Sequence, residues 1–265
     1  MVRSLDSALT TALNSVTRVP AFKLTIEDHV IHYAQYQAPA AADAWNDACI
    51  AGDNSIIRVQ VPRGGSGYVS AFQAQRITDP SQAAQWVSWV SLPGSSGLMF
   101  QDGGCAVSNS GGTLRAFAQR GTGGNDLWVW TSTNNGVTWS GPVSAVTPPG
   151  GALIKGIGSA GNNDVFFLYD VLGGEAMGCS FYSGGAWSAL TTWTLPAIPY
   201  GAGVAAAWAN SVYTIVYSDS YSLFSCTYNP SGNTWSSNPV IAPATSTAIG
   251  RFAPRISLAD NLYSR

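Results

Sequence analysis

Charged side chains are scarce in this chain of 265 residues: Asp, Glu, Lys and Arg make up 10% of it, and the formal net charge is −2. The 12 Lys and Arg residues form no cluster, whereas a nucleic-acid-binding surface or a basic membrane-surface helix needs one. Long apolar runs are also missing, because the most apolar one, Val204–Val216, is broken by Asn210 and Ser211. We therefore expect no nucleic-acid partner and no insertion into a membrane.

Cysteine and histidine are too few and too scattered for a metal centre. The four cysteines show no CxxC spacing, and Cys179 and Cys226 occupy equivalent positions before two tryptophans, where a small buried hydrophobe is expected. A disulfide between these two remains an open alternative. His29 and His32 lie three apart on an expected strand and therefore point to opposite faces. Phosphate loops, nucleophile elbows and dinucleotide motifs are absent, so we expect no metal and no cofactor.

Glycine (29 residues) and tryptophan (10 residues) are abundant instead, a composition typical of an all-β chain that is rich in turns. The most informative stretch runs from Trp128 to Ser140, where alternating apolar residues lead into Asn-Asn-Gly. Asn and Gly tolerate the positive φ that tight turns need. This stretch therefore predicts a β-hairpin with Trp139 folded over it.

The hairpin pattern recurs at a fixed interval. Trp187 follows Trp139 by 48 residues, and Trp235 follows Trp187 by 48 more. A glycine precedes each tryptophan by three positions and a serine follows each one; these are Gly136, Gly184, Gly232, Ser140, Ser188 and Ser236. Such a repeat has the length of one four-stranded propeller blade, and blades stack around an axis because one alone cannot bury both faces. We predict an all-β fold, a β-propeller of four-stranded blades.

The sequence Ser-Thr-Asn-Asn-Gly-Val-Thr-Trp that ends at Trp139 resembles the Asp-box repeat, Ser/Thr-x-Asp-x-Gly-x-x-Trp, of sialidase-like (BNR-repeat) β-propellers. Asn134 stands where the motif usually has Asp, and the two later copies are degenerate. The resemblance covers residues 67–265. In this family the Asp box is a structural turn away from the active site. The resemblance therefore implies structural roles for Ser132, Asn134, Gly136, Trp139, Gly184, Trp187, Gly232 and Trp235.

The part of the chain before residue 67 has a different pattern. Residues 1–18 predict an amphipathic helix, which either packs on its own domain or docks against a neighbouring subunit. The apolar face of this docking helix holds Leu5, Leu9, Leu13 and Val16. Residues 19–66 predict a small β-module, with strands at 21–29, 30–37 and 55–61 and a loop or short helix at 38–48. The glycine-rich stretch 63–67 is the expected linker to a propeller at 67–265.

The first repeat of this propeller, residues 68–92, shows only two outer strands. Either strands from the C-terminal end complete this blade and close a small ring, or the chain belongs to a longer protein with more blades. Closure by shared strands would avoid exposed strand edges. Both alternatives stay open at this point.

The start of the chain, Ser4–Leu9 and Arg18–Leu24, is similar to the opening of tail-associated phage proteins, and so is Ile77–Ser81. In those proteins a short helix and a small β-module precede a sialidase-like propeller. The resemblance implies a virion (tail) location, extracellular after lysis, with other tail subunits as partners and a homo-oligomeric state. The N-terminus shows no secretory signal pattern, which agrees with that expectation.

Catalysis by a sialidase mechanism requires, according to the family resemblance, three arginines, a Tyr–Glu pair and an Asp acid/base. The arginine candidates are Arg58, Arg76, Arg115, Arg120, Arg251 and Arg255. Only two glutamates are present, Glu27 and Glu175, and Glu175 follows a Gly-Gly turn. Of the aspartates that could form a glycosidase pair, Asp164 and Asp260 fall at predicted turns, where Asp serves the backbone. We predict that the protein is not an enzyme.

Aromatic side chains near loops and strand ends are the remaining candidates for ligand binding, because aromatic faces stack on sugars. These candidates are Trp193, Tyr200, Trp208, Tyr217 and Tyr221. For any one of them a core position is the alternative, but together they predict a glycan-binding face. The resulting hypothesis is a non-catalytic virion structural protein that binds a receptor glycan or takes part in assembly. A glycoside hydrolase acting on host surface polysaccharide and a secreted lectin are the alternatives.

Overall fold

The computed structural model describes residues 23–27, 30–34, 44–62, 71–86, 88–95, 100–120, 126–171, 174–195, 203–218 and 223–237. The chain divides into two compact units, Met1–Asp43 and Ala44–Arg265. In the first unit, β1 (Lys23–Glu27) and β2 (Val30–Ala34) pair as an antiparallel hairpin, which agrees with two of the predicted strands. The predicted docking helix, with Leu5, Leu9, Leu13 and Val16, lies outside the described residues.

The described residues of the second unit form four antiparallel sheets in which the strands are adjacent in chain order. The first sheet holds β3 (Ala44–Ile50), β4 (Ile56–Pro62), β5 (Gln73–Ile77) and β6 (Val90–Ser91). The second holds β7 (Phe100–Ser110), β8 (Thr113–Arg120), β9 (Leu127–Ser132) and β10 (Ser140–Val146). Two short 3-10 helices, η1 (Ala83–Trp86) and η2 (Pro149–Gly151), lie in connections.

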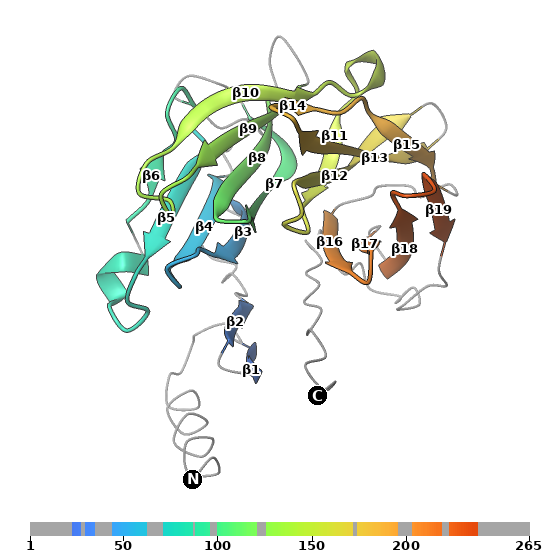
Figure 1. Cartoon of the computed structure of the whole chain (residues 1–265). Helices are drawn as coiled ribbons and strands as arrows, with labels where there is room; N and C mark the ends of the chain where they lie inside the picture. The colour runs from blue at the N-terminus through green and yellow to red at the C-terminus, as the bar shows by residue number, and fades with distance from the viewer. Residues whose placement is uncertain are drawn as a thin grey trace, which may run out of the picture. The chain divides into compact units, whose positions relative to one another are not determined.

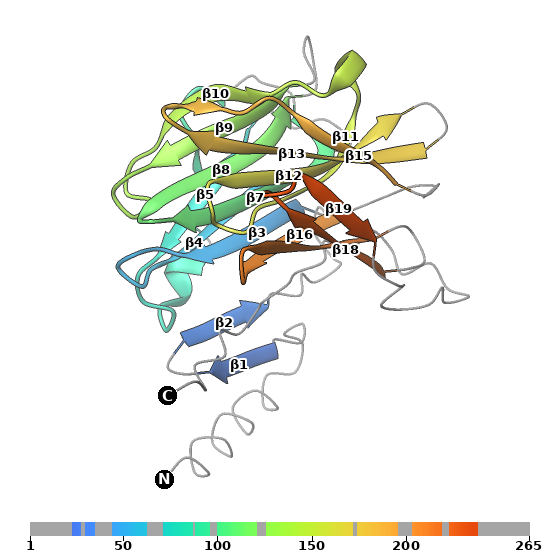
Figure 2. The ribbon, with the colours of Figure 1, turned by 45° about the vertical axis from the view of Figure 1, so that its right-hand side comes forward.

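The other two sheets repeat this plan. The third holds β11 (Ile154–Gly158), β12 (Asp164–Val171) and β13 (Gly174–Ser183), and its outer strand is split into β14 (Ala186–Trp187) and β15 (Thr191–Thr194). The fourth holds β16 (Gly203–Ala209), β17 (Val212–Ser218), β18 (Leu223–Asn229) and β19 (Thr234–Ser237). The first strands β3, β7, β11 and β16 pack against one another in that order (Figures 1 and 2). The predicted propeller fold is confirmed, with four blades in the described part of the chain.

The first blade begins earlier than the sequence suggested. β3 and β4 lie before residue 67, yet they form one sheet with β5 and β6, since Ile56 pairs with Ile77 and Gln60 with Gln73. The boundary expected between 66 and 67 therefore falls inside a blade. Neither C-terminal strands nor further blades are needed to complete the first repeat. The alanine-rich start of β3 had suggested a loop or helix, because it lacks the β-branched residues typical of strands.

Three apolar cores lie between successive blades. The core of the first and second blades surrounds Phe72 and Trp130, whose rings meet at 5.0 Å. In β12, Phe167 belongs to the core with the second blade and its neighbour Phe166 to the core with the fourth, because adjacent strand residues face opposite ways. Each large apolar side chain buried in this way contributes about 1.5–3 kcal/mol to folding.

The inner strands approach closely at glycines. A Cβ on Gly156 of β11 would lie 2.7 Å from the Cα of Gly203 in β16. This approach leaves no room for a side chain, so the third and fourth blades meet through bare backbone at the propeller's centre.

One end of every blade carries the turns between its first and second strands and between its third and fourth strands, because the strands alternate in direction. Backbone with positive φ concentrates there. The non-glycine residues with positive φ are Asn54, Asn135, Asn163, Asn210, Ser211 and Asn233. Asn is the side chain that adopts this conformation at the lowest cost, which explains why asparagine marks these turns. We call this the turn end of the blades.

Replacing Gly136 by alanine should destabilise the protein by about 2–4 kcal/mol, because the residue has φ +79 and a Cβ would lie 2.7 Å from Ile57 Cδ1 of the first blade. Gly112→Ala is the matched control: its φ is +86, but no atom lies within 4 Å of the added Cβ. That variant should lose only about 1–2 kcal/mol. Urea unfolding measures both, and equal losses would contradict the packing of this turn on the first blade.

Candidate functional site

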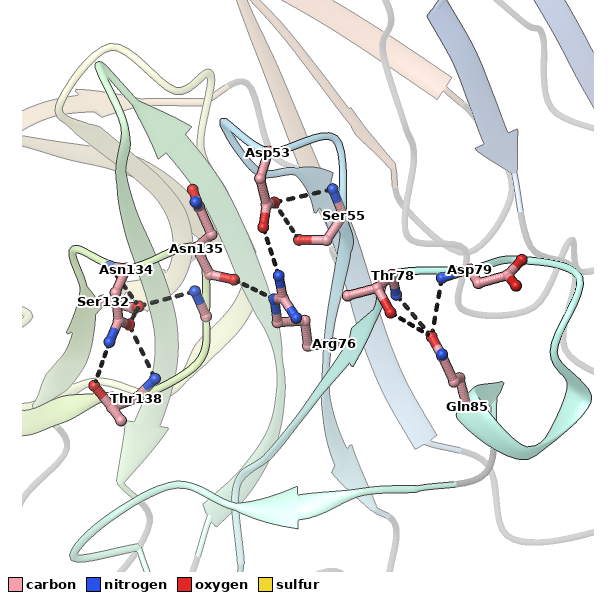
Figure 3. A network of polar contacts seen from close by, with 11 residues as sticks. Asp53, Ser55, Arg76, Thr78, Asp79, Gln85, Ser132, Asn134, Asn135 and Thr138 are labelled. Carbon is pink, nitrogen blue, oxygen red and sulfur yellow. Dashed lines mark hydrogen bonds and ion pairs between the residues drawn. The ribbon is translucent and has the colours of Figure 1, made fainter.

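The Asp-box-like turn at 132–139 is held by side chains of the motif itself (Figure 3). Ser132 Oγ accepts a hydrogen bond from Gly136 N at 3.0 Å and donates to Asn134 Oδ1 at 3.0 Å. Asn134 Oδ1 also accepts from Thr138 N at 2.9 Å, while Asn134 Nδ2 donates to Thr138 Oγ1 at 2.8 Å. The amide uses both its acceptor and its donor, so asparagine serves in a position where the motif usually has aspartate.

A second set of contacts ties this turn to the first blade (Figure 3). Arg76, at the end of β5, donates through Nε to Asn135 O at 2.9 Å and pairs with Asp53 Oδ2 at 2.5 Å. Asp53 also accepts hydrogen bonds from Ser55 Oγ and Ser55 N, at 2.6 and 3.1 Å. The bond from Ser55 Oγ, followed by the backbone bond and Arg76, lowers the pKa of Asp53 to about 2. Arg76 therefore connects the first and second blades, and we call such a contact region between two blades a seam.

The three repeated tryptophans occupy comparable places. Trp139 precedes the outer strand of its blade, whereas Trp187 and Trp235 begin theirs, and each packs on the core shared with the preceding blade. Trp187 meets Phe117 of the second blade at 5.7 Å, and Trp235 meets Phe166 of the third at 6.3 Å. The accompanying glycines differ: Gly184 has positive φ, but in the last copy Asn233 takes that conformation instead of Gly232.

Asp164 organises the corresponding end of the third blade. This carboxylate is 1% exposed and accepts hydrogen bonds from Ala160 N and Asn162 N, both at 2.7 Å. The turn that it holds reaches both neighbouring blades, because Asn162 Nδ2 donates to Tyr213 Oη at 3.0 Å and Arg115 Nη1 donates to Asn163 Oδ1 at 2.6 Å. Desolvation raises the pKa of Asp164 to about 6, against the effect of these hydrogen bonds.

The stability of the protein should therefore depend on the ionisation of Asp164. A folded-state pKa above the unfolded value of about 3.9 means that the folded protein binds the proton more tightly. The stabilisation from this carboxyl is fully present below about pH 4 and is lost as the pH rises through about 6. Asp164→Asn should remove that part of the pH dependence, as measured by urea unfolding between pH 4 and pH 7. Asp170→Asn, which breaks a surface pair with Lys155 at 3.2 Å, is the control, and an unchanged profile in Asp164→Asn would contradict this assignment.

Of the aromatic residues predicted to bind glycan, the three that the structure describes all pack in the core between the third and fourth blades. Tyr217 is 3% exposed and stacks on Phe224 at 5.5 Å, so it belongs to the core. Trp193 is half-buried and stacks on Trp235 at 5.6 Å, whereas Trp208 packs on Tyr213 at 4.3 Å. Tyr200 and Tyr221 lie outside the described residues. The three described side chains serve the seam between the third and fourth blades.

The groups considered for catalysis or metal binding are also dispersed. Glu175 is 3% exposed at the start of β13. Within the described ranges, no three His, Cys, Asp or Glu residues gather as a metal site, and no helix is long and apolar enough to cross a membrane. All four cysteines are free, so the disulfide left open for Cys179 and Cys226 is not formed. Burial raises the pKa of each of these two thiols to about 12.

Two arginines stack on tryptophans of their own blade. Arg58 lies over Trp89 at 4.9 Å and over Trp86 at 5.5 Å, and it is 7% exposed. Arg120, at the end of β8, lies over Trp128 of β9 at 5.0 Å, and both residues are half-buried. This second pair lies at the opposite end of the blade from the Asp-box-like turn.

The Arg120–Trp128 pair is the candidate functional site that sequence reasoning missed. Among the described residues neither Arg120 Nε nor Trp128 Nε1 has a hydrogen-bond acceptor, although both atoms are buried. The sequence had pointed to each residue separately: Arg120 was a candidate for the arginines of a sialidase mechanism, and Trp128 begins the first predicted hairpin. Their proximity follows from the register that pairs Ala118 with Trp128, which places Arg120 two residues further along the same face.

No family model matches the sequence, and no curated protein matches it. Solved structures do share its fold. Hadza microbial sialidase Hz136 has a TM-score of 0.54 at 17% identity, over 76% of this chain and 47% of that one. GH43B of the Bacteroides ovatus xyloglucan locus has a TM-score of 0.51 at 16% identity, over 77% and 43%. The six-bladed Aleuria aurantia lectin has a TM-score of 0.50 at 12% identity, over 77% and 62%.

These likenesses overturn the prediction that the protein is not an enzyme, because a sialidase and a GH43 glycoside hydrolase are among the structures that resemble it. That prediction rested on the scarcity of glutamate, which bears on the sialidase mechanism only, and on the assignment of two aspartates, Asp164 and Asp260, to turns. The chain spans 47%, 43% and 62% of the lengths of the three structures. At these identities the comparisons establish the fold, a β-propeller shared by carbohydrate-cleaving enzymes and lectins.

Proposed function

We propose that this propeller binds a carbohydrate and that Arg120 and Trp128 form part of the binding surface. The observation that carries the proposal is the half-buried indole of Trp128 stacked with the guanidinium of Arg120 at 5.0 Å. Ligand sites combine aromatic surface with a few well-placed polar groups, and sugars present both apolar ring faces and hydroxyl acceptors. The pair supplies a ring face together with donors for such acceptors.

The fold supports this choice of ligand without deciding it. Three structures that share the fold are described as a sialidase, a GH43 protein of a xyloglucan locus and a fucose-recognising lectin. Because one fold serves many functions, the argument rests on the Arg120–Trp128 pair and not on the likeness alone. The arginines between blades are poorer candidates for binding a ligand, because Arg76 and Arg115 already donate hydrogen bonds to neighbouring blades.

Trp128→Ala should weaken glycan binding at least about tenfold, the equivalent of about 1.4 kcal/mol, because it removes the aromatic platform. A glycan array followed by calorimetry on the best ligand measures this effect. Trp208→Ala is the comparison, since it changes an aromatic residue of the fourth blade that the sequence had suggested.

The same material should be assayed for release of reducing ends, which would add hydrolysis to binding. If wild-type protein neither binds nor cleaves any glycan, the proposal fails. If Trp208→Ala abolishes binding and Trp128→Ala does not, the site belongs to the fourth blade instead.

We also propose that the protein is a structural component of a virion tail, where it binds other tail subunits and further copies of itself. The support is the resemblance of the N-terminal sequence to tail-associated proteins and the division of the chain at Ala44 into two units. Such a division allows one unit to serve assembly while the other recognises a ligand.

Deleting residues 1–18 should convert an assembled species into monomers without changing the thermal unfolding of the propeller, because the proposed docking helix is lost and the blades are not. Sedimentation of the full-length and shortened proteins measures the change. A monomeric full-length protein, or a shortened protein that assembles equally well, would contradict the docking role.

A further inference from the structure

Arg120 differs from the other arginines of the described blades in what its guanidinium contacts. Arg76 pairs with Asp53, Arg115 donates to Asn163 and Arg58 donates to Gln75 Oε1 at 2.9 Å. In the described part of the chain, no carboxylate pairs with Arg120, and its only recorded side-chain contact is the stack on Trp128. Among the described residues, its positive charge therefore has no carboxylate partner.

The N–H donors of the pair also lack acceptors among the described residues, as does the indole N–H of Trp235 in the core between the third and fourth blades. Two other indoles find carbonyl oxygens, since Trp130 Nε1 donates to Pro93 O and Trp86 Nε1 donates to Pro80 O, both at 2.9 Å. Trp128 Nε1 and Arg120 Nε are buried donors without an acceptor. A buried donor that stays unpaired costs free energy, and an arriving acceptor recovers that free energy.

The carboxylate nearest in sequence does not serve as that acceptor. Asp126 accepts the backbone N–H of Arg120 through its own backbone oxygen at 3.1 Å. Its carboxylate instead accepts a hydrogen bond from Thr147 Oγ1 at 2.5 Å. The pair thus offers one permanent positive charge and two N–H donors, and its recorded contacts include no acidic group.

We propose that the Arg120–Trp128 pair recognises an acidic group on a sugar, a carboxylate or a sulfate, and that the ligand is therefore an acidic glycan. A guanidinium matches a two-oxygen anion in planar, bidentate fashion, and its stack on the indole keeps it oriented. The indole N–H adds a further donor. A neutral sugar supplies hydroxyl acceptors but leaves the charge of Arg120 uncompensated. This inference rests on the proposed carbohydrate binding and adds the class of ligand.

The test compares acidic probes with their neutralised forms by calorimetry on the full chain. The probes are oligogalacturonate with its carboxyl-reduced form, and a sulfated galactan oligosaccharide with its desulfated form. We expect at least about tenfold tighter binding of one acidic probe than of its neutral form, and an affinity that falls as salt is raised. Loss on carboxyl reduction identifies a carboxylate as the recognised group, and loss on desulfation identifies a sulfate.

Matched variants locate the effect. Arg120→Gln removes the charge, and Trp128→Phe removes the indole donor while keeping an aromatic ring; each should reduce the acidic preference about tenfold. Trp89→Phe makes the same change in the other arginine–tryptophan stack and should leave the preference unchanged. Thermal unfolding checks that all three variants are folded.

The possible outcomes separate this inference from the proposed function. Equal affinity for acidic and neutral probes, or an unchanged preference in Arg120→Gln and Trp128→Phe, overturns the inference and leaves carbohydrate binding standing. Absence of binding to every glycan overturns the proposed function itself, and the inference with it.

Discussion

Each blade of this propeller is a twisted sheet with two faces that must both be covered, and the rest of the structure follows from this requirement. In β12 the neighbours Phe166 and Phe167 are both fully buried, one in the core with the fourth blade and one in the core with the second. A single blade would expose both of them to water, at a cost of about 1.5–3 kcal/mol for each side chain. Blades are therefore stable only as neighbours, which is why the sequence repeats one hairpin pattern along its length.

Polar side chains fix how the blades meet, and they do so at the turn end. Arg76 and Arg115 cross from one blade to the turn of the next, and Asp164 holds a turn that contacts both of its neighbours. Arg120 lies at the other end of its strand and crosses to no neighbouring blade in any recorded contact. The same residue type thus serves assembly at one end of a blade, and at the other end we propose that it contacts a ligand.

The sequence predicted the parts of the fold that depend on local pattern. The spacing of Trp139, Trp187 and Trp235 was sufficient to predict the blades, because each tryptophan follows a turn whose geometry its own neighbours determine. The first blade was divided wrongly between two domains because its outer strands are joined by residues 78–89, with η1, instead of an Asp-box-like turn. The Arg120–Trp128 pair depends on the register between β8 and β9, which the local pattern does not contain. The role of Trp193 and Trp208 in a seam likewise depends on which blade lies beside them.

The most direct test of the account is the environment of the Trp128 indole N–H when a glycan binds. In a nitrogen–proton correlation spectrum of the full chain, with its 10 tryptophans, the Trp128 signal can be assigned by its loss in Trp128→Phe. The account predicts that an acidic oligosaccharide shifts this signal strongly downfield and leaves Trp86 and Trp130, whose N–H groups already have acceptors, in place. Saturation of the protein with a glycan that leaves the Trp128 signal unmoved would contradict it.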